Sequence, residues 1–327
     1  MKIYIENSSW NNVGDFFYQN SILEIFKNLF KDFNICSFDA PIQRSFKINN
    51  IFFKNALNLR DFIDGDIFVL SGPILGSSFL KDYGEFIKRI YSQKKKYLIL
   101  SAYGKDLDEN KNFLKKYPPY ALSTRSTETY EIYKDCAFNS YNGICNAFFL
   151  PFFSNVPIIK NKKYIVKSFY SMHEPDLSFN TKNDKIDINS ICLKYKKSYF
   201  WKLYRHFNYF IKSKDQINDY EIFRVHHDLS YKFNHLNFSK KNSYLSYNIN
   251  NYLSIYHNAK LVLSDRVHSV VLGLAYGVPA MLCGKWDRSS LLEKLKLKKI
   301  NECYLPPKRS DIHEELENYK SWLKSLF

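Results

Sequence analysis

Short apolar runs alternate along the chain with segments whose apolar residues have helical spacing. The clearest case starts at residue 261, where an apolar run leads into Ser264-Asp265-Arg266-Val267-His268. Apolar residues then recur at the i, i+3, i+4, i+7 spacing of a helix buried along one face. Gly277 and Pro279 end that helix, and a further apolar run predicts the next strand. We therefore predict a β-α-β unit with Arg266 and His268 at the carboxyl end of its first strand, where open α/β sheets bind ligands.

The same alternation extends over both halves of the chain. In the N-terminal half it predicts strands at 2–6, 66–70, 96–101 and 121–123. It predicts a helix after the Asn12–Asp15 turn, with apolar residues from Ile22 to Phe30, and helices at 79–92 and 128–134. In the C-terminal half it predicts strands at 164–170, 220–226, 261–263 and 278–282, and helices at 199–212, 247–257, 267–275, 289–295 and 312–327. Strands that alternate with helices favour a mostly parallel sheet covered on both faces.

This organisation predicts an α/β fold of two Rossmann-like domains that face a central cleft, with the ligand bound between them. Two prolines and a Lys-Asn-Lys-Lys sequence place the linker at 151–163. We assign residues 1–155 to an N-terminal domain and 163–305 to a C-terminal domain. Residues 306–327 are expected to form a closing C-terminal helix. The length of 327 residues fits two domains.

Composition limits the partners that need to be considered. The net charge of +16 comes from lysine clusters scattered along the chain. They indicate either a solvated surface or attraction to anionic partners, such as lipid head groups and nucleotide-sugars. The sequence has no zinc finger, RNA-recognition signature or basic helix, so we expect no nucleic-acid partner. Its six cysteines form no CxxC pair, and no metal, iron–sulfur cluster or disulfide framework is expected.

The N-terminal sequence lacks the apolar stretch of a signal peptide. The longest uncharged run, 136–159, is interrupted by asparagines, serines, glycine and prolines, which argues against a membrane span. We expect a cytoplasmic protein, and peripheral contact with the anionic inner face of the membrane stays open.

Arg266 and His268 carry the chemistry that the pattern indicates. Amide groups at a helix N-terminus favour anions, and a guanidinium can hold a carboxylate or phosphate with two parallel bonds. An imidazole can donate or accept a proton near neutral pH. Asp265 has three candidate roles: it could cap the helix, orient His268 or form an ion pair with Arg266.

Further candidates also follow predicted strands. Asn12, Gly14 and Asp15 occupy the first strand-to-helix turn. Gly14 permits close backbone approach or a positive φ, and Asp15 could bind sugar hydroxyls or cap the next helix. The chain has neither GxGxxG nor GxxxxGK[ST], so the usual dinucleotide and P-loop interpretations lose their support.

Basic residues follow two other strands. Arg125 is either a surface residue or an anion clamp that faces the cleft. Lys285 and Arg288 come after strand 278–282 and can reach the crevice of His268. Adjacent histidines at 226 and 227 would point to opposite sides of a strand, so they form a poor chelating pair. Contact of one of them with a donor or acceptor remains open.

The sequence Leu261-Val-Leu-Ser-Asp-Arg-Val-His-Ser269, followed by Ala275-Tyr-Gly-Val-Pro-Ala280, resembles the polysaccharide pyruvyltransferase family. Supporting matches include Asn12-x-Gly14-Asp15, Asp66-Ile-Phe-Val-Leu-Ser-Gly72, Ser101-Ala-Tyr-Gly104 and Leu122-Ser-Thr-Arg125. The resemblance covers residues 12 to about 295 and implies a GT-B-like fold, with the acceptor on the N-terminal domain and the donor on the C-terminal domain. It further implies transfer of pyruvate from phosphoenolpyruvate to sugar hydroxyls of a cell-surface glycan or its lipid-linked precursor, as a ketal, with release of phosphate and no further cofactor.

The resemblance also implies roles for the candidate residues. His268 would protonate C3 of the donor as a hydroxyl attacks C2. Arg266, Arg125 and either Arg288 or Lys285 would hold the donor and stabilise the departing phosphate. Asp15 would serve as base or bind the acceptor. Two other functions stay open: a glycosyltransferase that uses a nucleotide-sugar, and a non-catalytic protein that binds glycans or lipid phosphates.

Overall fold

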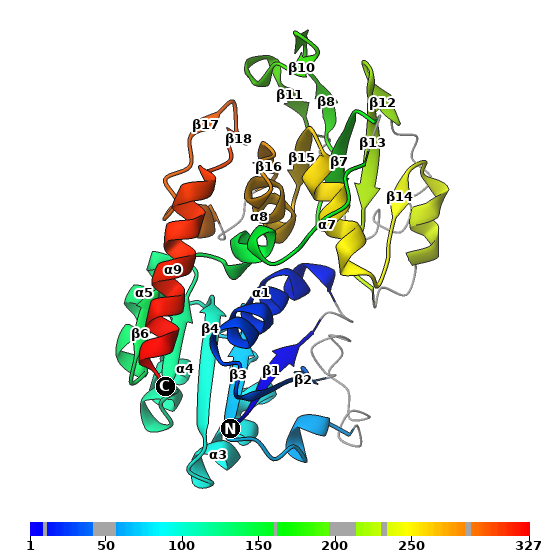
Figure 1. Ribbon diagram of the computed structural model, residues 1–327. Helices are drawn as coiled ribbons and strands as arrows, with labels where there is room; N and C mark the ends of the chain where they lie inside the picture. Colours follow the sequence, from blue (N-terminus) through cyan, green and yellow to red (C-terminus); the bar gives the residue numbers. More distant parts are fainter. Residues whose placement is uncertain (9–11, 42–56, 160–161, 196–213, 230–233, 285–288) are drawn as a thin grey trace.

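The computed structural model describes residues 1–8, 12–41, 57–159, 162–195, 214–229, 234–284 and 289–327. It has two α/β domains that lie one above the other (Figure 1). The predicted helix at 199–212 and the candidate residues Lys285 and Arg288 lie outside the described residues.

The N-terminal domain is built on a six-stranded, wholly parallel sheet in the order β2-β1-β3-β4-β5-β6. Its strands are β1 (Lys2–Asn7), β2 (Asn34–Asp39), β3 (Ile67–Ser71), β4 (Lys96–Ala102), β5 (Ala121–Thr124) and β6 (Ser140–Asn142). Its helices are α1 (Val13–Leu29), α3 (Phe79–Ser92), α4 (Asp108–Lys116) and α5 (Thr127–Tyr133), with short 3-10 turns η2 (Leu59–Asp61), η3 (Lys134–Cys136) and η4 (Asn146–Phe152). The strands predicted in this half are confirmed, and the edge strands β2 and β6 are additional.

The C-terminal domain has an eight-stranded mixed sheet with β7 (Tyr164–Ser168) in its interior. Parallel partners of the central group are β13 (Tyr220–Val225), β15 (Leu261–Ser264) and β16 (Ala280–Leu282). The outer strands are β12 (Gln216–Ile217) and β14 (Ser243–Tyr244), which pair with β13, and β17 (Lys299–Ile300). Strand β18 (Cys303–Tyr304) lies between β16 and β17 and is antiparallel to both. Two antiparallel pairs join β8 (Asp176–Ser178) to β11 (Cys192–Lys194) and β9 (Thr181–Lys182) to β10 (Lys185–Ile186). The helical segments are η5 (Ile188–Ser190), η7 (Asn234–Ser239), α7 (Ile249–Asn258), α8 (Val267–Ala275) and η8 (Ser289–Leu292).

The predicted β-α-β unit is confirmed as β15, α8 and β16. Gly277 has φ +80, and the Val278 amide donates to the Gly273 carbonyl at 2.9 Å, which closes the end of α8. A Cβ at Gly273 would stand 2.8 Å from Cγ2 of Val262, so glycine lets the helix approach its strand closely. The strand predicted at 164–170 ends at Ser168, because the amides of Tyr170 and Ser171 donate to the Asp265 carboxylate instead of to a neighbouring strand.

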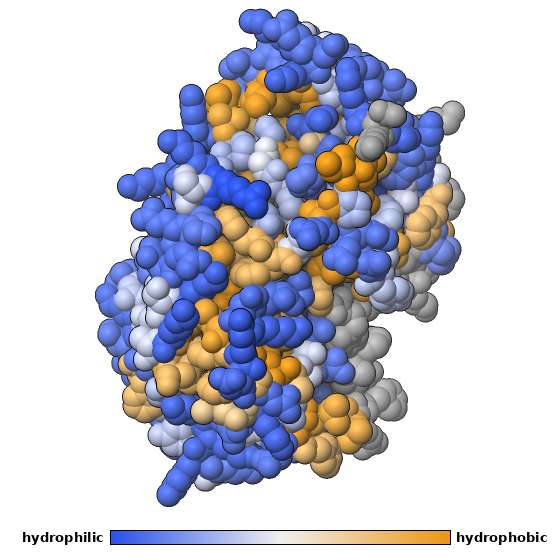
Figure 2. All heavy atoms as spheres, in the orientation of Figure 1, coloured by the Kyte–Doolittle hydropathy of each residue, from blue (hydrophilic) through white to orange (hydrophobic). Residues whose placement is uncertain are grey.

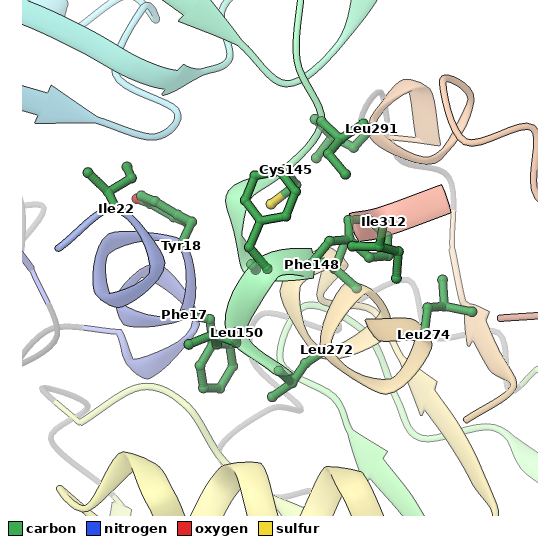
Figure 3. Packing of buried hydrophobic residues seen from close by; sticks show 14 of the residues in the cluster. Phe17, Tyr18, Ile22, Cys145, Phe148, Leu150, Leu272, Leu274, Leu291 and Ile312 are labelled. Atoms are coloured by element: carbon green, nitrogen blue, oxygen red, sulfur yellow. The ribbon is translucent and has the colours of Figure 1, made fainter. Parts of the chain in front are cut away.

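One apolar cluster runs through both domains and fixes their arrangement. In Figure 3 the turn η4 lies between α1 and α8, with Phe148 and Leu150 close to side chains of both helices. Phe17, Phe148 and Leu272 are completely buried. Helices α1 and α8 therefore pack against the same turn, η4.

The C-terminal helix α9 (Arg309–Ser325) runs from the C-terminal domain back along the N-terminal one (Figure 1). Tyr319 Oη lies 3.2 Å from Ser123 Oγ, and Tyr120 Oη donates to the Leu326 carbonyl at 2.8 Å. Hydrophilic side chains cover much of the face in Figure 2. Over the described ranges, no helix combines the length and apolar character needed to cross a membrane.

Candidate active site

A pocket of about 250 Å³ lies between the two domains. Its walls come from the N-terminus of α1 and from the loops that follow β7, β13 and β15, and are formed by Asn12, Gly14, Asp15, Tyr170, Ser171, His227, Asp228, Asp265, Arg266, Val267 and His268. These three strands are parallel neighbours, so their carboxyl ends meet at one edge of the sheet. Ligand pockets commonly measure about 300–1,000 Å³, so this one suits a small ligand.

Two helix N-termini border the pocket from opposite domains. Asn12 caps α1 by accepting a hydrogen bond from the Gly14 amide at 2.9 Å, and Arg266 is the residue before α8. The Val13 amide also donates to the His227 carbonyl at 3.0 Å, which joins α1 to the C-terminal domain. Both helix ends favour negative charge. The pocket therefore attracts anions from two sides.

Gly14 keeps the centre of this pocket open. A Cβ there would lie 3.4 Å from Nδ1 of His227, 3.4 Å from Nδ1 of His268 and 3.1 Å from Oδ1 of Asn12. Gly14 lies in α1, and its φ is not positive. A positive φ is therefore not the reason for glycine here, and close approach of its backbone to a ligand stays a prediction.

His268 is 5% exposed and forms a contact across the domain boundary. Its Nε2 lies 2.8 Å from Nη1 of Arg125. A guanidinium can only donate, so Nε2 accepts and the neutral ring carries its proton on Nδ1. That atom lies 3.7 Å from Oδ1 of Asp15. The arrangement holds His268 neutral, with its proton toward a carboxylate in the pocket wall.

Arg125 is completely buried and stands behind His268 rather than in the pocket wall. Its guanidinium lies over the rings of Tyr18 and Tyr103, 5.3 and 5.8 Å from their centroids. Within the described ranges, its Nε and Nη2 have no acceptor, and no carboxylate forms an ion pair with it. A buried charge without a counter-charge is costly, which favours an anion at this position.

Arg266 and Asp265 shape the opposite wall. Arg266 forms an ion pair with Asp228 and lies over the Tyr170 ring, 4.4 Å from its centroid. The Asp265 carboxylate accepts the amides of Tyr170, Ser171 and Met172 at 2.5–3.0 Å and so holds the loop after β7. Burial raises the pKa of Asp265, although the charge of Arg266 and these amides oppose the rise. This loop contact differs from the three roles expected for Asp265.

The described wall is less cationic than the sequence suggests. It contains Arg266, whereas its carboxylates are those of Asp15, Asp228 and Asp265. The Cys283 amide donates to the Ser264 carbonyl at 2.7 Å, so the chain leaves β16 beside the loop that carries Arg266. Lys285 and Arg288 follow in sequence, and their part in the site stays a prediction. In the part of the chain that the structure describes, no group of three or more His, Cys, Asp or Glu could hold a metal ion.

The structure adds wall residues that sequence reasoning did not select. Tyr170 and Ser171 follow β7, and Asp228 follows β13. His227 is 1% exposed, and its Nε2 lies 2.9 Å from Oη of Tyr256. Burial, together with the charge of Arg266 and neighbouring His226, lowers the pKa of His227 well below its ordinary value. The signal for His227 in the sequence is its position at the carboxyl end of a predicted strand.

The family model for polysaccharide pyruvyl transferase matches residues 12–284. The chain belongs to this family. The matched range contains the whole pocket wall and Arg125. Membership in the polysaccharide pyruvyl transferase family makes the protein a transferase of polysaccharide biosynthesis, which sets aside the alternative of a non-catalytic binding protein.

Solved structures of similar fold agree with this architecture. The structure of S. aureus MnaA with UDP has a TM-score of 0.52 at 8% identity, over 97% of this chain and 86% of that chain. A putative UDP-N-acetylglucosamine 2-epimerase from Listeria monocytogenes has a TM-score of 0.51 at 9% identity, over 100% and 90%. At this identity the similarity shows the fold alone, and it confirms the predicted GT-B-like pair of Rossmann-like domains. No curated protein sequence matches the chain.

Proposed function

We propose that this transferase moves the pyruvyl group of phosphoenolpyruvate onto hydroxyls of a bacterial cell-surface polysaccharide or of its lipid-linked precursor. The product is a ketal, and phosphate is released. The observation that supports this proposal best is the buried Arg125 guanidinium, which contacts His268 and has no carboxylate partner among the described residues. A donor with a carboxylate and a phosphate would supply the missing negative charge.

The donor would lie between the N-termini of α1 and α8. Arg266 would exchange Asp228 for one anionic group of the donor, with two hydrogen bonds in place of its present ion pair. Arg125 would turn from His268 toward the second anionic group. Lys285 and Arg288, which follow β16 in sequence, would complete the donor site and stabilise the departing phosphate. Asn12, Gly14 and Asp265 would contribute the shape of the pocket.

Departure of Arg125 would change the protonation of His268. Once Nε2 no longer accepts from the guanidinium, the ring can bind a second proton, and Asp15 beside Nδ1 stabilises the charged form. Charged His268 then gives a proton to C3 of the donor while an acceptor oxygen bonds to C2. The π electrons of the C2–C3 bond become the new C3–H bond. Asp15 either takes part as a base or binds the acceptor.

A lipid-linked acceptor would bring the enzyme to the inner face of the membrane. The net charge of +16 favours approach to a surface that carries anionic lipids. We therefore propose cytoplasmic action with peripheral membrane contact.

A nucleotide-sugar glycosyltransferase is the second candidate, because the S. aureus neighbour was determined with UDP. Thermal stabilisation separates the two donors. Phosphoenolpyruvate should raise Tm while UDP leaves it unchanged, and the reverse result would favour the nucleotide-sugar.

Turnover is measured as phosphate release from phosphoenolpyruvate with a panel of p-nitrophenyl glycosides or lipid-linked sugars. His268→Gln should lower kcat by at least about 100-fold with little change in Tm. His313→Gln, on exposed α9, is the matched control and should keep the wild-type rate. No phosphate release with any acceptor would contradict the donor proposal, and an active His268→Gln would remove His268 from the mechanism.

A further inference from the structure

The ring of His227 is fixed at the domain boundary by contacts on several sides. Phe17 of α1 meets it edge-on at a centroid distance of 5.5 Å, and Tyr252 of α7 does so at 5.6 Å. Its Nε2 hydrogen-bonds with Tyr256 Oη at 2.9 Å, and its backbone carbonyl accepts the Val13 amide. The ring therefore has a single well-defined orientation.

The second ring nitrogen of His227 is buried beside Gly14, at the wall of the active-site pocket. Among the residues that the structure describes, Nδ1 has no hydrogen-bond partner, although the residue is 1% exposed. A Cβ at Gly14 would be 3.4 Å from this atom and equally far from Nδ1 of His268. The two nitrogens thus lie no more than twice that distance apart, both beside Gly14. An unpaired buried nitrogen at the wall of a pocket indicates a ligand contact.

The chemistry of the surroundings keeps this nitrogen available. When Nε2 donates to Tyr256, Nδ1 beside Gly14 retains its lone pair. Burial, followed by the charge of Arg266 and by His226, lowers the pKa of His227, so the free enzyme holds the ring neutral. An anionic donor bound at Arg266 would offset that positive charge and make Nδ1 a stronger base.

We infer that His227 is the catalytic base for the acceptor, and that its Nδ1 takes the proton from the hydroxyl that attacks C2; this rests on the proposed function. The oxygen–hydrogen pair of electrons forms the new bond to C2. The proton moves to Nδ1 of His227, while C3 receives its proton from His268. The adduct still carries phosphate. When its C2–O bond to phosphate breaks, the leaving phosphate takes the proton from His227. A second acceptor hydroxyl then bonds to C2 to close the ketal and gives its proton to Nδ1, and exchange with solvent restores both histidines. The pocket would then have an acid and a base that both lie beside Gly14.

This assignment gives Asp15 a separate task. Its Oδ1 lies 3.7 Å from Nδ1 of His268, so its charge supports the protonated acid. His227 then takes the proton from the attacking hydroxyl, so Asp15 need not act as the base as well as stabilise charged His268.

Two amide substitutions separate the nitrogens of His227. His227→Asn keeps a polar atom near the position of Nδ1 but cannot take up a proton. His227→Gln keeps a polar atom near Nε2, and hence the bond to Tyr256, but has nothing at Nδ1. His226→Asn is the matched control, because His226 is adjacent and lies outside the pocket wall. The assays are phosphate release from phosphoenolpyruvate with p-nitrophenyl glycosides, the thermal shift with phosphoenolpyruvate alone, and Tm.

We expect both His227 variants to lose at least about 100-fold in kcat, while the thermal shift with phosphoenolpyruvate and Tm stay near wild type. His226→Asn should keep the wild-type kcat. The inference is overturned if His227→Asn keeps kcat within threefold of wild type, because a hydrogen-bond contact would then suffice. It is also overturned if both variants lose donor binding and Tm together, because the role of His227 would then be structural. If wild type releases no phosphate with any acceptor, the proposed function and this inference fall together. If wild type turns over and the His227 variants remain active, the assignment of His227 as base is refuted and the proposed function stands.

Discussion

Glu174 holds the end of the loop that forms one wall of the pocket, and its replacement tests that support. Its carboxylate is 8% exposed and bridges two strands, with Oε1 2.9 Å from Nζ of Lys167 in β7 and Oε2 3.1 Å from Nε of Arg224 in β13. The loop that carries Tyr170 and Ser171 runs from the end of β7 to this carboxylate. Glu174→Gln would leave both cations buried with one counter-charge removed.

The size of the effect follows from the charge environment. Burial raises the pKa of Glu174, but Lys167 and Arg224 outweigh it and lower the pKa from 4.5 to about 2. A carboxyl with that change contributes about 3 kcal/mol to the free energy of unfolding at neutral pH. Removal of one partner from a buried ion pair costs a similar amount, about 3–5 kcal/mol. We therefore expect Glu174→Gln to lose about 3 kcal/mol at pH 7.

Urea unfolding at pH 7 and at pH 3.5 measures this loss. Because the pKa is lowered on folding, the stabilisation is complete above pH 4.5 and is lost as pH falls toward 2. The difference in the free energy of unfolding between wild type and Glu174→Gln should be about 1.4 kcal/mol smaller at pH 3.5 than at pH 7. Glu221→Gln is the control: its partner Lys162 is 3.1 Å away at the surface, and the loss should stay within about 1 kcal/mol. A difference below about 1 kcal/mol for Glu174→Gln at pH 7, or one that does not change with pH, would refute the reasoning.

Two further substitutions test the pocket itself. Gly14→Ala should lower kcat/KM by about tenfold or more at unchanged Tm, because the added Cβ would lie 3.4 Å from Nδ1 of His227 and of His268. Steady-state kinetics and a thermal melt measure the effect, and wild-type kinetics would contradict the prediction. Asp265→Ala should release the amides of Tyr170 and Ser171, so that their hydrogen exchange becomes faster while the amides of β4 are unaffected. Unchanged protection of those two amides would show that Asp265 does not hold the loop.

Local patterns in the sequence were sufficient for much of the fold. The β-α-β unit around His268 could be predicted because its apolar spacing and its Gly277 stop are properties of neighbouring residues. Strand β2 could not be predicted, because it lies at the sheet edge and most of its side chains are partly exposed, which weakens the hydrophobic signal. The pattern predicts strand beyond Ser168, because Phe169 and Tyr170 continue the apolar run. The strand ends there because the Tyr170 amide donates to Asp265, a contact that the local pattern does not contain.

The candidate site shows more clearly which features follow from the local sequence and which follow from the tertiary structure. Sequence alone determined that Arg266 and His268 follow a strand and begin a helix, because those relations are local. Only the tertiary structure decided that Arg125 contacts His268 from 143 positions away, and that His227 and Gly14 meet across a domain boundary. These contacts depend on how η4 packs between α1 and α8, and packing between distant segments leaves no periodic trace in either one.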